Sequence, residues 1–299
     1  GLAASVVAVE AMLESGIPFP GAIEISGTVD EESGGYAGVA WLAERGHFSK
    51  PRVDHVIIPE PLYKDSVCLG HRGVWWAEIE IRGRIAHGSM PFLGVSAIRG
   101  MAAFLEKVEH ELYPQLAERR TAMPVIPDAA RQSTLNFNSI HGGLDEQDLT
   151  SGFPSALVAD RCRVVLDRRY LMEEDEAEVR AEVVEILDRL SAERDEFEYA
   201  LRELWSVPPT LTEPDSPLVR ALDRNIERVL GTPSRHVASP GTYDQKHVWR
   251  VGKLKDCVAY GPGILELAHQ PDEYIDIDDM VASAKVMAAA ALDLLRGSE

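Results

Sequence analysis

Apolar residues recur along this chain with two different periods, and the alternation of these periods predicts its elements. Spacings of three and four residues predict helices over 2–14, 36–45, 95–112, 173–190, 216–230 and 277–295. Short continuous or alternating runs predict strands over 22–26, 53–59, 74–82, 133–140, 156–166, 196–204 and 257–260. The Pro-rich stretch 113–127 predicts a surface loop.

The order of these elements predicts an inserted domain. Strands that alternate with helices in residues 1–70 indicate a parallel sheet with helices on its faces, which residues 209–299 rejoin. Between them, residues 71–208 follow the order β-α-β-β-α-β with half-exposed alternating strands, which is typical of a ferredoxin-like α+β module. The predicted fold class is therefore α/β, a mixed sheet with helices on both faces, plus this inserted module.

The composition indicates which partners and which cellular compartment to expect. The formal net charge is −19 and hydrophobic residues make up 45%, which favours a globular protein without nucleic-acid or membrane partners. Cys68, Cys162 and Cys257 lie far apart and form no CxxC pair, so a reducing, cytoplasmic setting is expected. No apolar run reaches the ~18 residues that a membrane span needs. Because the chain begins directly with a helical pattern and no Met, we expect it to be part of a longer protein.

Three adjacent acids, Asp30-Glu31-Glu32, precede the pair Gly34-Gly35 at the end of a predicted strand. Adjacent carboxylates repel one another, so their ionised forms need a cation among them. One acid can then bind a metal while its neighbour handles protons. The alternative interpretation is a solvated helix N-terminus, where the helix dipole favours acids.

Glu60 and His269 add two more groups of the same chemistry. Glu60 follows the predicted strand 53–59, and His269 lies beside acids in the loop before the last helix. Ligands of open α/β sheets bind beyond the carboxyl ends of strands, where Glu60 and the acid triplet are both expected. Carboxylates with neutral imidazole are a usual zinc ligand set. Six other histidines match no motif and are predicted to be surface or packing residues: His47, His55, His110, His141, His236 and His247.

Five stretches together resemble the dinuclear zinc amidohydrolase family of acetylornithine deacetylase, succinyl-diaminopimelate desuccinylase, aminoacylase and glutamate carboxypeptidase. Each is similar to a motif of that family, and they occur in the family's order: Gly1-Leu2-Ala3-Ala4, Asp30-Glu31-Glu32-Ser33-Gly34-Gly35, Pro59-Glu60-Pro61, Ala86-His87-Gly88-Ser89-Met90-Pro91 and Ala268-His269-Gln270-Pro271-Asp272-Glu273. The resemblance implies a zinc-peptidase-like catalytic domain over 1–70 and 209–299, and a lid and dimerisation domain over 71–208.

The resemblance also implies roles for individual residues. Glu31 corresponds to the general base, while Glu32, Glu60 and His269 correspond to ligands of two divalent ions, with zinc expected and cobalt or manganese as alternatives. His87 corresponds to the lid histidine that stabilises the oxyanion in the partner subunit's site, which implies a homodimer. Weaker matches, Asp167-Arg168-Arg169 and Gly241-Thr242-Tyr243-Asp244, point to substrate binding by Arg169 and Thr242.

This chain departs from the family pattern in two places. The family's first zinc histidine, its neighbouring aspartate and the bridging aspartate would all lie upstream of residue 1, so each metal lacks ligands here. Either an N-terminal segment associates as a separate partner, or the chain is inactive. In addition, Ala156-Leu157-Val158-Ala159-Asp160 stands where relatives carry a lid asparagine.

The predicted activity is metal-dependent hydrolysis of amide bonds in small N-acyl amino acids or related carboxylated amides. Two zinc ions would share and acidify a water, and Glu31 would take its proton. A dipeptidase, carboxypeptidase or aromatic-amine hydrolase is the first alternative. A metal-free dimerisation or binding module that keeps only the fold is the second.

Overall fold

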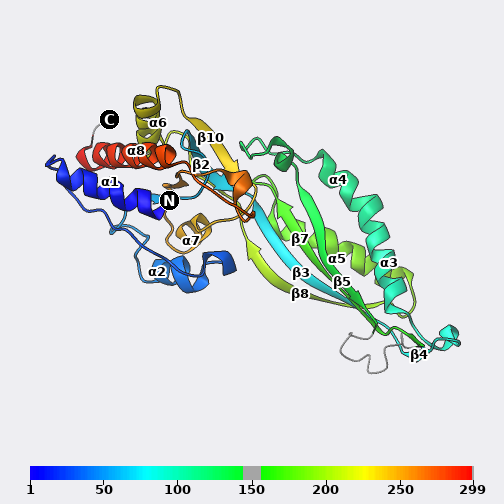
Figure 1. Ribbon diagram of the computed structural model, residues 1–299. Helices are drawn as coiled ribbons and strands as arrows, with labels where there is room; N and C mark the ends of the chain where they lie inside the picture. The colour runs from blue at the N-terminus through cyan, green and yellow to red at the C-terminus, as the bar shows by residue number, and fades with distance from the viewer. Residues whose placement is uncertain (144–155, 298–299) are drawn as a thin grey trace. The chain divides into compact units, whose positions relative to one another are not determined.

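The computed structural model describes residues 1–143 and 156–297, which divide into two compact units. Unit 1 consists of residues 1–72, 123–128 and 210–299, and unit 2 of residues 73–122 and 129–209. The described part of each unit has its own sheet and its own buried core. Figure 1 shows the elements of both units in chain order.

The sheet of unit 1 is mixed. Its strands lie in the order β1 (Val56–Ile58), β11 (Cys257–Ala259), β2 (Ser66–His71) and β10 (Arg235–Ser239), and the short β9 (Thr210–Leu211) pairs with β2. β1 runs parallel to β11 and β10 runs parallel to β2, whereas β11 and β2 are antiparallel. The predicted mixed sheet is therefore confirmed, although β2 and β10 were not among the strands expected from the sequence.

Helices cover both faces of this sheet. α1 (Leu2–Glu14), α6 (Pro217–Leu230) and α8 (Ile277–Arg296) share one core with Val67, Leu69 and Val258. Alternate residues of the same strands, such as Cys257, face the other side, where they meet Val248 of α7 (Gln245–Arg250). This alternation follows from the two-residue period of a strand. Figure 1 shows α1 and α8 side by side. The other short helices of unit 1 are η1 (Glu31–Ser33), η2 (Tyr36–Ala40), α2 (Trp41–Glu44) and η7 (Leu265–Leu267).

The segment 22–26 is not a strand, which corrects the prediction. Its residues are exposed or half-exposed, and it makes no backbone hydrogen bond with the rest of the described chain. It borders a cavity of about 480 Å³ whose other walls come from α1, β1 and α8. An apolar run forms a strand only where a neighbouring strand pairs with it, and none of the described strands pairs with this segment.

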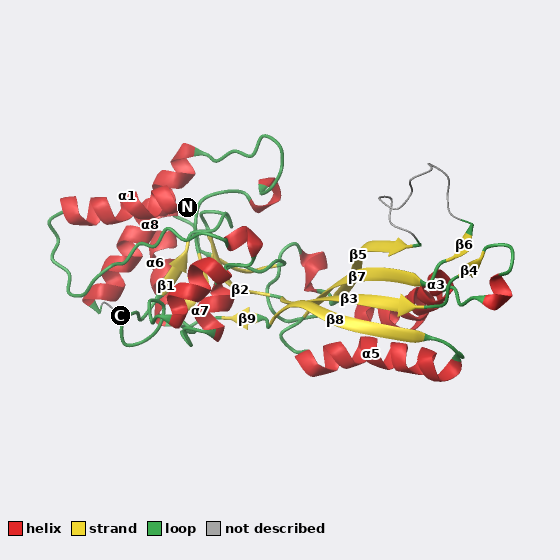
Figure 2. Ribbon diagram, turned by 90° about the horizontal axis from the view of Figure 1, so that it is seen from below, coloured by secondary structure: helices red, strands yellow, loops and turns green. Residues whose placement is uncertain are grey.

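Unit 2 has the topology that the sequence predicted. Its sheet is antiparallel, with the order β5 (Thr134–Gly142), β7 (Arg161–Tyr170), β3 (Gly73–Arg82) and β8 (Glu198–Val207). These strands and the helices between them follow the ferredoxin-like β-α-β-β-α-β order. Figure 2 shows the four strands in a row with α5 (Glu176–Glu193) beside them. The small elements are β4 (Ala86–His87), β6 (Leu157–Val158), η3 (Pro91–Leu93) and η5 (Asp128–Arg131).

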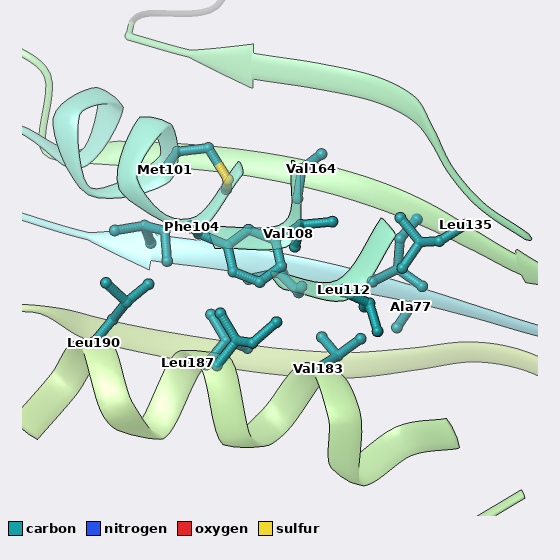
Figure 3. Packing of buried hydrophobic residues seen from close by; sticks show 14 of the residues in the cluster. Ala77, Met101, Phe104, Val108, Leu112, Leu135, Val164, Val183, Leu187 and Leu190 are labelled. Atoms are coloured by element: carbon teal, nitrogen blue, oxygen red, sulfur yellow. The ribbon is translucent and has the colours of Figure 1, made fainter. Parts of the chain in front are cut away.

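Two helical segments pack in one layer on one face of the sheet of unit 2. The helical stretch 97–118, made of α3 (Ala97–Lys107), η4 (Val108–Leu112) and α4 (Tyr113–Glu118), buries Phe104 and Val108. α5 buries Val183 and Leu187 in the same cluster, which Figure 3 shows from close by. The helix α4 lies inside the predicted loop 113–127, so that loop prediction is wrong for residues 113–118, where Leu116 joins the core.

The remaining features concern the whole described chain. None of its helices is long and apolar enough to cross a membrane. Cys68, Cys162 and Cys257 are buried and free.

Candidate active site

The loop that carries the acid triplet is shaped by left-handed residues. Asp30 (φ 71°), Gly34 (φ 110°) and Gly35 (φ 76°) surround the single 3₁₀ turn of η1. Oδ2 of Asp30 accepts a hydrogen bond from the backbone N–H of Ala37 at 2.9 Å, which fixes the start of η2. A non-glycine residue with positive φ is uncommon and strained. The strained backbone at Asp30 therefore sets the direction in which the chain continues into Glu31 and Glu32.

Glu32 and His269 lie together at the surface of unit 1. Oε2 of Glu32 is 3.8 Å from Nε2 of His269, and the two side chains are 76% and 72% exposed. His269 also has a positive φ of 61°, and its backbone N–H donates to Oε2 of Glu273 at 3.3 Å. Two loops far apart in sequence thus present one carboxylate and one imidazole to each other.

Glu60 is the most strongly perturbed carboxyl group of the site. Burial, followed by the charges of Glu31, Asp244 and Glu32, raises the pKa of Glu60 to about 7, while the charge of Lys246 opposes this shift. These groups therefore lie close enough for their charges to interact through a poorly solvated region. The charges of Glu31 and Glu32 thus act on Glu60, although residues 22–26 form no strand.

Glu31 is affected both by the surface pair Glu32–His269 and by the buried Lys246. The pKa of Glu31 is raised overall, chiefly by burial and also by the charge of Glu32. The charges of Lys246 and His269 act in the opposite direction. Nζ of Lys246 is 3.9 Å from Oε1 of Glu31. Glu31 is thus half-buried beside a cation, and its carboxyl group holds a proton more readily than a solvated glutamate does.

The stretch 244–247 supplies groups to this site to which the sequence assigned no role, although Asp244 ends the weakly matching motif 241–244. Burial is again the largest cause that raises the pKa of Asp244, to about 6. Its Oδ1 accepts no hydrogen bond within the described chain and lies 3.7 Å from Nζ of Lys246. Gln245, fully buried, donates from Nε2 to the carbonyl of Leu69 at 3.1 Å and so ties the stretch to β2.

His247 was predicted to be a surface or packing residue, and the structure gives it a definite contact with the acid loop. Its Nε2 donates to the carbonyl of Gly34 at 2.5 Å, and its Nδ1 accepts from Nε of Arg250 at 3.1 Å. Burial lowers the pKa of His247 to about 4, so the ring is neutral, as this pair of bonds requires. The local order of polar and apolar residues around His247 does not reveal this contact, because its burial depends on packing between segments that are far apart in the sequence.

The other candidate residues have surroundings of their own. Thr242 is half-buried in unit 1, between β10 and α7. His87 belongs to unit 2, is exposed, and lies with Nδ1 at 2.7 Å from Oγ of Ser89. Arg169, also in unit 2, donates from Nε and Nη2 to the two carboxylate oxygens of Asp167 at 2.6 and 3.0 Å. Its guanidinium fork is therefore already bound by its own strand.

The donor set of unit 1 fits a divalent cation chemically. Asp244 is buried and Glu60 and Glu31 are half-buried, all three with raised pKa values, and Oδ1 of Asp244 is left without a hydrogen bond. Among the described residues, however, no group of three His, Cys, Asp or Glu side chains is close enough to hold a metal ion. The site thus has suitable ligand chemistry but not a closed coordination shell.

Comparison with known sequences identifies the family. The sequence profile of Peptidase family M20/M25/M40 matches residues 1–293, and the chain therefore belongs to this family. It is 27% identical over 270 residues to the acetylornithine deacetylase of Myxococcus xanthus, in an alignment that covers 90% of this chain and 64% of the deacetylase. The chain thus spans less than two thirds of that relative. The family predicted from the five motifs is confirmed.

Solved structures show the same fold. The aminopeptidase PepT of Bacillus cereus ATCC 10987 superposes with a TM-score of 0.71 at 20% identity, covering 95% of this chain and 67% of PepT. The YXEP protein of Bacillus subtilis, a dinuclear metal-binding peptidase of family M20, has a TM-score of 0.68 at 14% identity, with coverage of 98% and 70%. At these identities the likeness concerns the fold, and it confirms the predicted fold class.

Proposed function

We propose that this chain carries the catalytic machinery of a metal-dependent hydrolase that cleaves amide bonds in small N-acyl amino acids or related carboxylated amides. The observation that supports this most strongly is the convergence of Glu31, Glu60 and Asp244 in a poorly solvated part of unit 1, beside the Glu32–His269 pair. Membership of a peptidase family and the likeness to a deacetylase agree with it.

In this proposal Glu32, Glu60 and His269 hold two divalent ions, with zinc expected. Bound ions would polarise the amide carbonyl and acidify the attacking water. Glu31 takes a proton from that water and later delivers it to the leaving amine, and with the second proton of the water the products are a carboxylate and an ammonium group. The raised pKa of Glu31 suits this role, because a base that is too weak would not hold the proton between the two steps.

The two units have separate tasks in this proposal. Residues 1–70 and 209–299 form the catalytic domain, and residues 71–208 form a lid and dimerisation domain. His87 stabilises the developing oxyanion of the partner subunit's substrate. Thr242 and Arg169 bind the substrate, and a substrate carboxylate must displace Asp167 from the fork of Arg169. The free cysteines suit a reducing compartment such as the cytoplasm.

A substrate panel tests the activity. The protein is assayed with N-acyl amino acids, dipeptides and N-acyl aromatic amines, each with Zn²⁺, Co²⁺ or Mn²⁺ and with a chelator. We expect release of amino acid from the N-acyl substrates with metal and none with chelator. Preference for dipeptides would favour the peptidase alternative. A chain that neither retains metal nor hydrolyses any substrate would be a fold-only module.

The base is tested by Glu31→Gln, which keeps the size of the side chain but removes the proton acceptor. We expect turnover to fall by about 10²–10⁴-fold, the usual contribution of general acid–base catalysis, with metal content unchanged. Glu14→Gln, a change on the exposed side of α1, is the matched control and should retain the parent rate. If Glu31→Gln remained as active as the control, another group would be the base.

A further inference from the structure

Lys246 places a buried ammonium group inside the carboxyl cluster of unit 1. Its side chain is 1% exposed. Nζ lies 3.7 Å from Oδ1 of Asp244 and 3.9 Å from Oε1 of Glu31, beyond hydrogen-bonding distance from either oxygen. The contact is therefore one between charges. Burial of an ammonium group is costly unless carboxylates compensate it, so this lysine depends on its acidic neighbours.

The dependence is mutual, because the charge of Lys246 acts on three carboxyl groups at once. It opposes the repulsion among Glu31, Asp244 and Glu60, and all three respond to it. The imidazole of His269, in contrast, lies at the surface beside Glu32. Lys246 thus stands on the buried side of the cluster.

We propose that Lys246 is a positioning residue, whose ammonium group holds Glu31 and Asp244 together and directs Glu31 into the site while no divalent ion is present. The part that concerns Glu31 as the base depends on the function proposed above. A consequence is that Lys246 and a divalent ion compete for the same carboxylates. The ammonium group and a divalent ion attract the same carboxylates, so Lys246 supports the metal-free protein and weakens the binding of metal.

The first test compares unfolding temperatures in a chelator and in excess Zn²⁺. The variant is Lys246→Met, and Lys285→Met, on an exposed position of α8, is the matched control. We expect Lys246→Met to unfold at a lower temperature in the chelator, and Zn²⁺ to raise its unfolding temperature by more than it raises that of the parent. The control should follow the parent. An equal loss in both media would mean that Lys246 only packs, and would overturn the proposal.

The second test measures zinc affinity by competition with a chromogenic chelator. Removal of one positive charge beside the ligands should tighten the binding of Zn²⁺ by at least about tenfold. Unchanged or weaker binding by Lys246→Met would contradict the proposed competition. If Lys246→Met does not fold, Lys246→Gln provides the same comparison, because it also lacks the charge.

The third test uses neither metal nor substrate. In the chelator at about pH 8, where carboxylates are ionised, Glu31→Gln is combined with Lys246→Met in a double-mutant cycle. We expect Glu31→Gln to restore part of the stability that Lys246→Met loses, since it removes one unpaired carboxylate. Strict additivity would overturn the proposal. A parent that shows this coupling but hydrolyses no substrate would disprove the proposed function and leave the role of Lys246 intact.

Discussion

Each unit of this protein buries a cation among carboxylates, and the two clusters differ in their balance of charge. In unit 2, Arg168 is fully buried and its Nη2 lies 2.6 Å from Glu174 and 3.3 Å from Glu182. Arg119 pairs with the same two glutamates, so two guanidinium groups meet two carboxylates. In unit 1, Lys246 is equally buried but lies 3.7 and 3.9 Å from its two nearest carboxylates.

The pKa shifts of the two clusters have opposite signs. Burial by itself would raise the pKa of Glu174, but the charge of Arg168 and hydrogen bonds from Ser133 and Arg119 outweigh it and lower the pKa. In unit 1, burial and neighbouring carboxylates raise the pKa of Glu60 to about 7 despite Lys246. A balanced cluster therefore stabilises its fold, whereas a cluster short of positive charge retains a capacity to bind a cation.

The largest effect on stability is expected from Arg168→Met, which leaves Glu174 and Glu182 with one guanidinium group instead of two. Breaking a buried ion pair in this way costs about 3–5 kcal/mol. Hydrogen exchange of β7 and α5 measures it, since these elements carry the cluster. Arg202→Met, whose exposed pair with Glu78 spans 3.1 Å, is the control and should change stability by less than about 1 kcal/mol. Equal losses would remove the distinction between a buried balanced cluster and a surface pair.

A smaller effect is expected from Gly35→Ala, which tests how tightly the cluster of unit 1 is packed. A Cβ at this position would lie 2.3 Å from Oδ1 of Asp244, and φ is +76°. Gly231→Ala is the matched control, because φ is +74° there and the space is open. The control should lose about 1 kcal/mol from backbone strain, and Gly35→Ala about 1–3 kcal/mol more, since Asp244 must move. Denaturant unfolding with a chelator measures both, and equal losses would mean that Asp244 yields freely.

The smallest expected effect is on the pH dependence of the stability of unit 2, through Glu174 of its balanced cluster. Because the folded-state pKa of Glu174 is lowered from its ordinary value of 4.5, its stabilisation is complete above that pH. It is lost as the pH falls through the lower, folded-state value. Glu174→Gln should therefore make the loss of stability of unit 2 below about pH 4.5 less steep. An unchanged slope in hydrogen exchange of α5 would mean that Glu174 gains no net stabilisation from its partners.

Local pattern was sufficient for most helices and for unit 2, and insufficient for the sheet of unit 1. Burial alternates along all of β7 and along β3 from Trp75 onward, which suits the strands that the sequence predicted there. β2 (Ser66–His71) is buried throughout but includes a serine and a histidine, and its stability comes from β10 and β11. Residues 22–26 show the converse, an apolar run that pairs with none of the described strands. Strand pairing is a non-local property, which a local window cannot contain.

The candidate site shows the same limit. Glu31, Glu32 and Glu60 could be found because carboxylates follow turns and strand ends in recognisable motifs. Lys246 and His247 could not, because consecutive charged and polar residues look like a solvated surface until packing buries them. On β7, successive residues Arg168 and Arg169 face opposite sides, and only the structure shows that the first is buried and the second is held by Asp167.

The contact between Gly35 and Asp244 also constrains how such a chain can change over generations. A side chain at position 35 would take the space that the carboxylate at position 244 occupies, and the left-handed backbone penalises it as well. Position 35 can accept a side chain only if the residue at position 244 is replaced or moves. A lineage that alters position 35 must therefore pass through paired substitutions or lose the cluster.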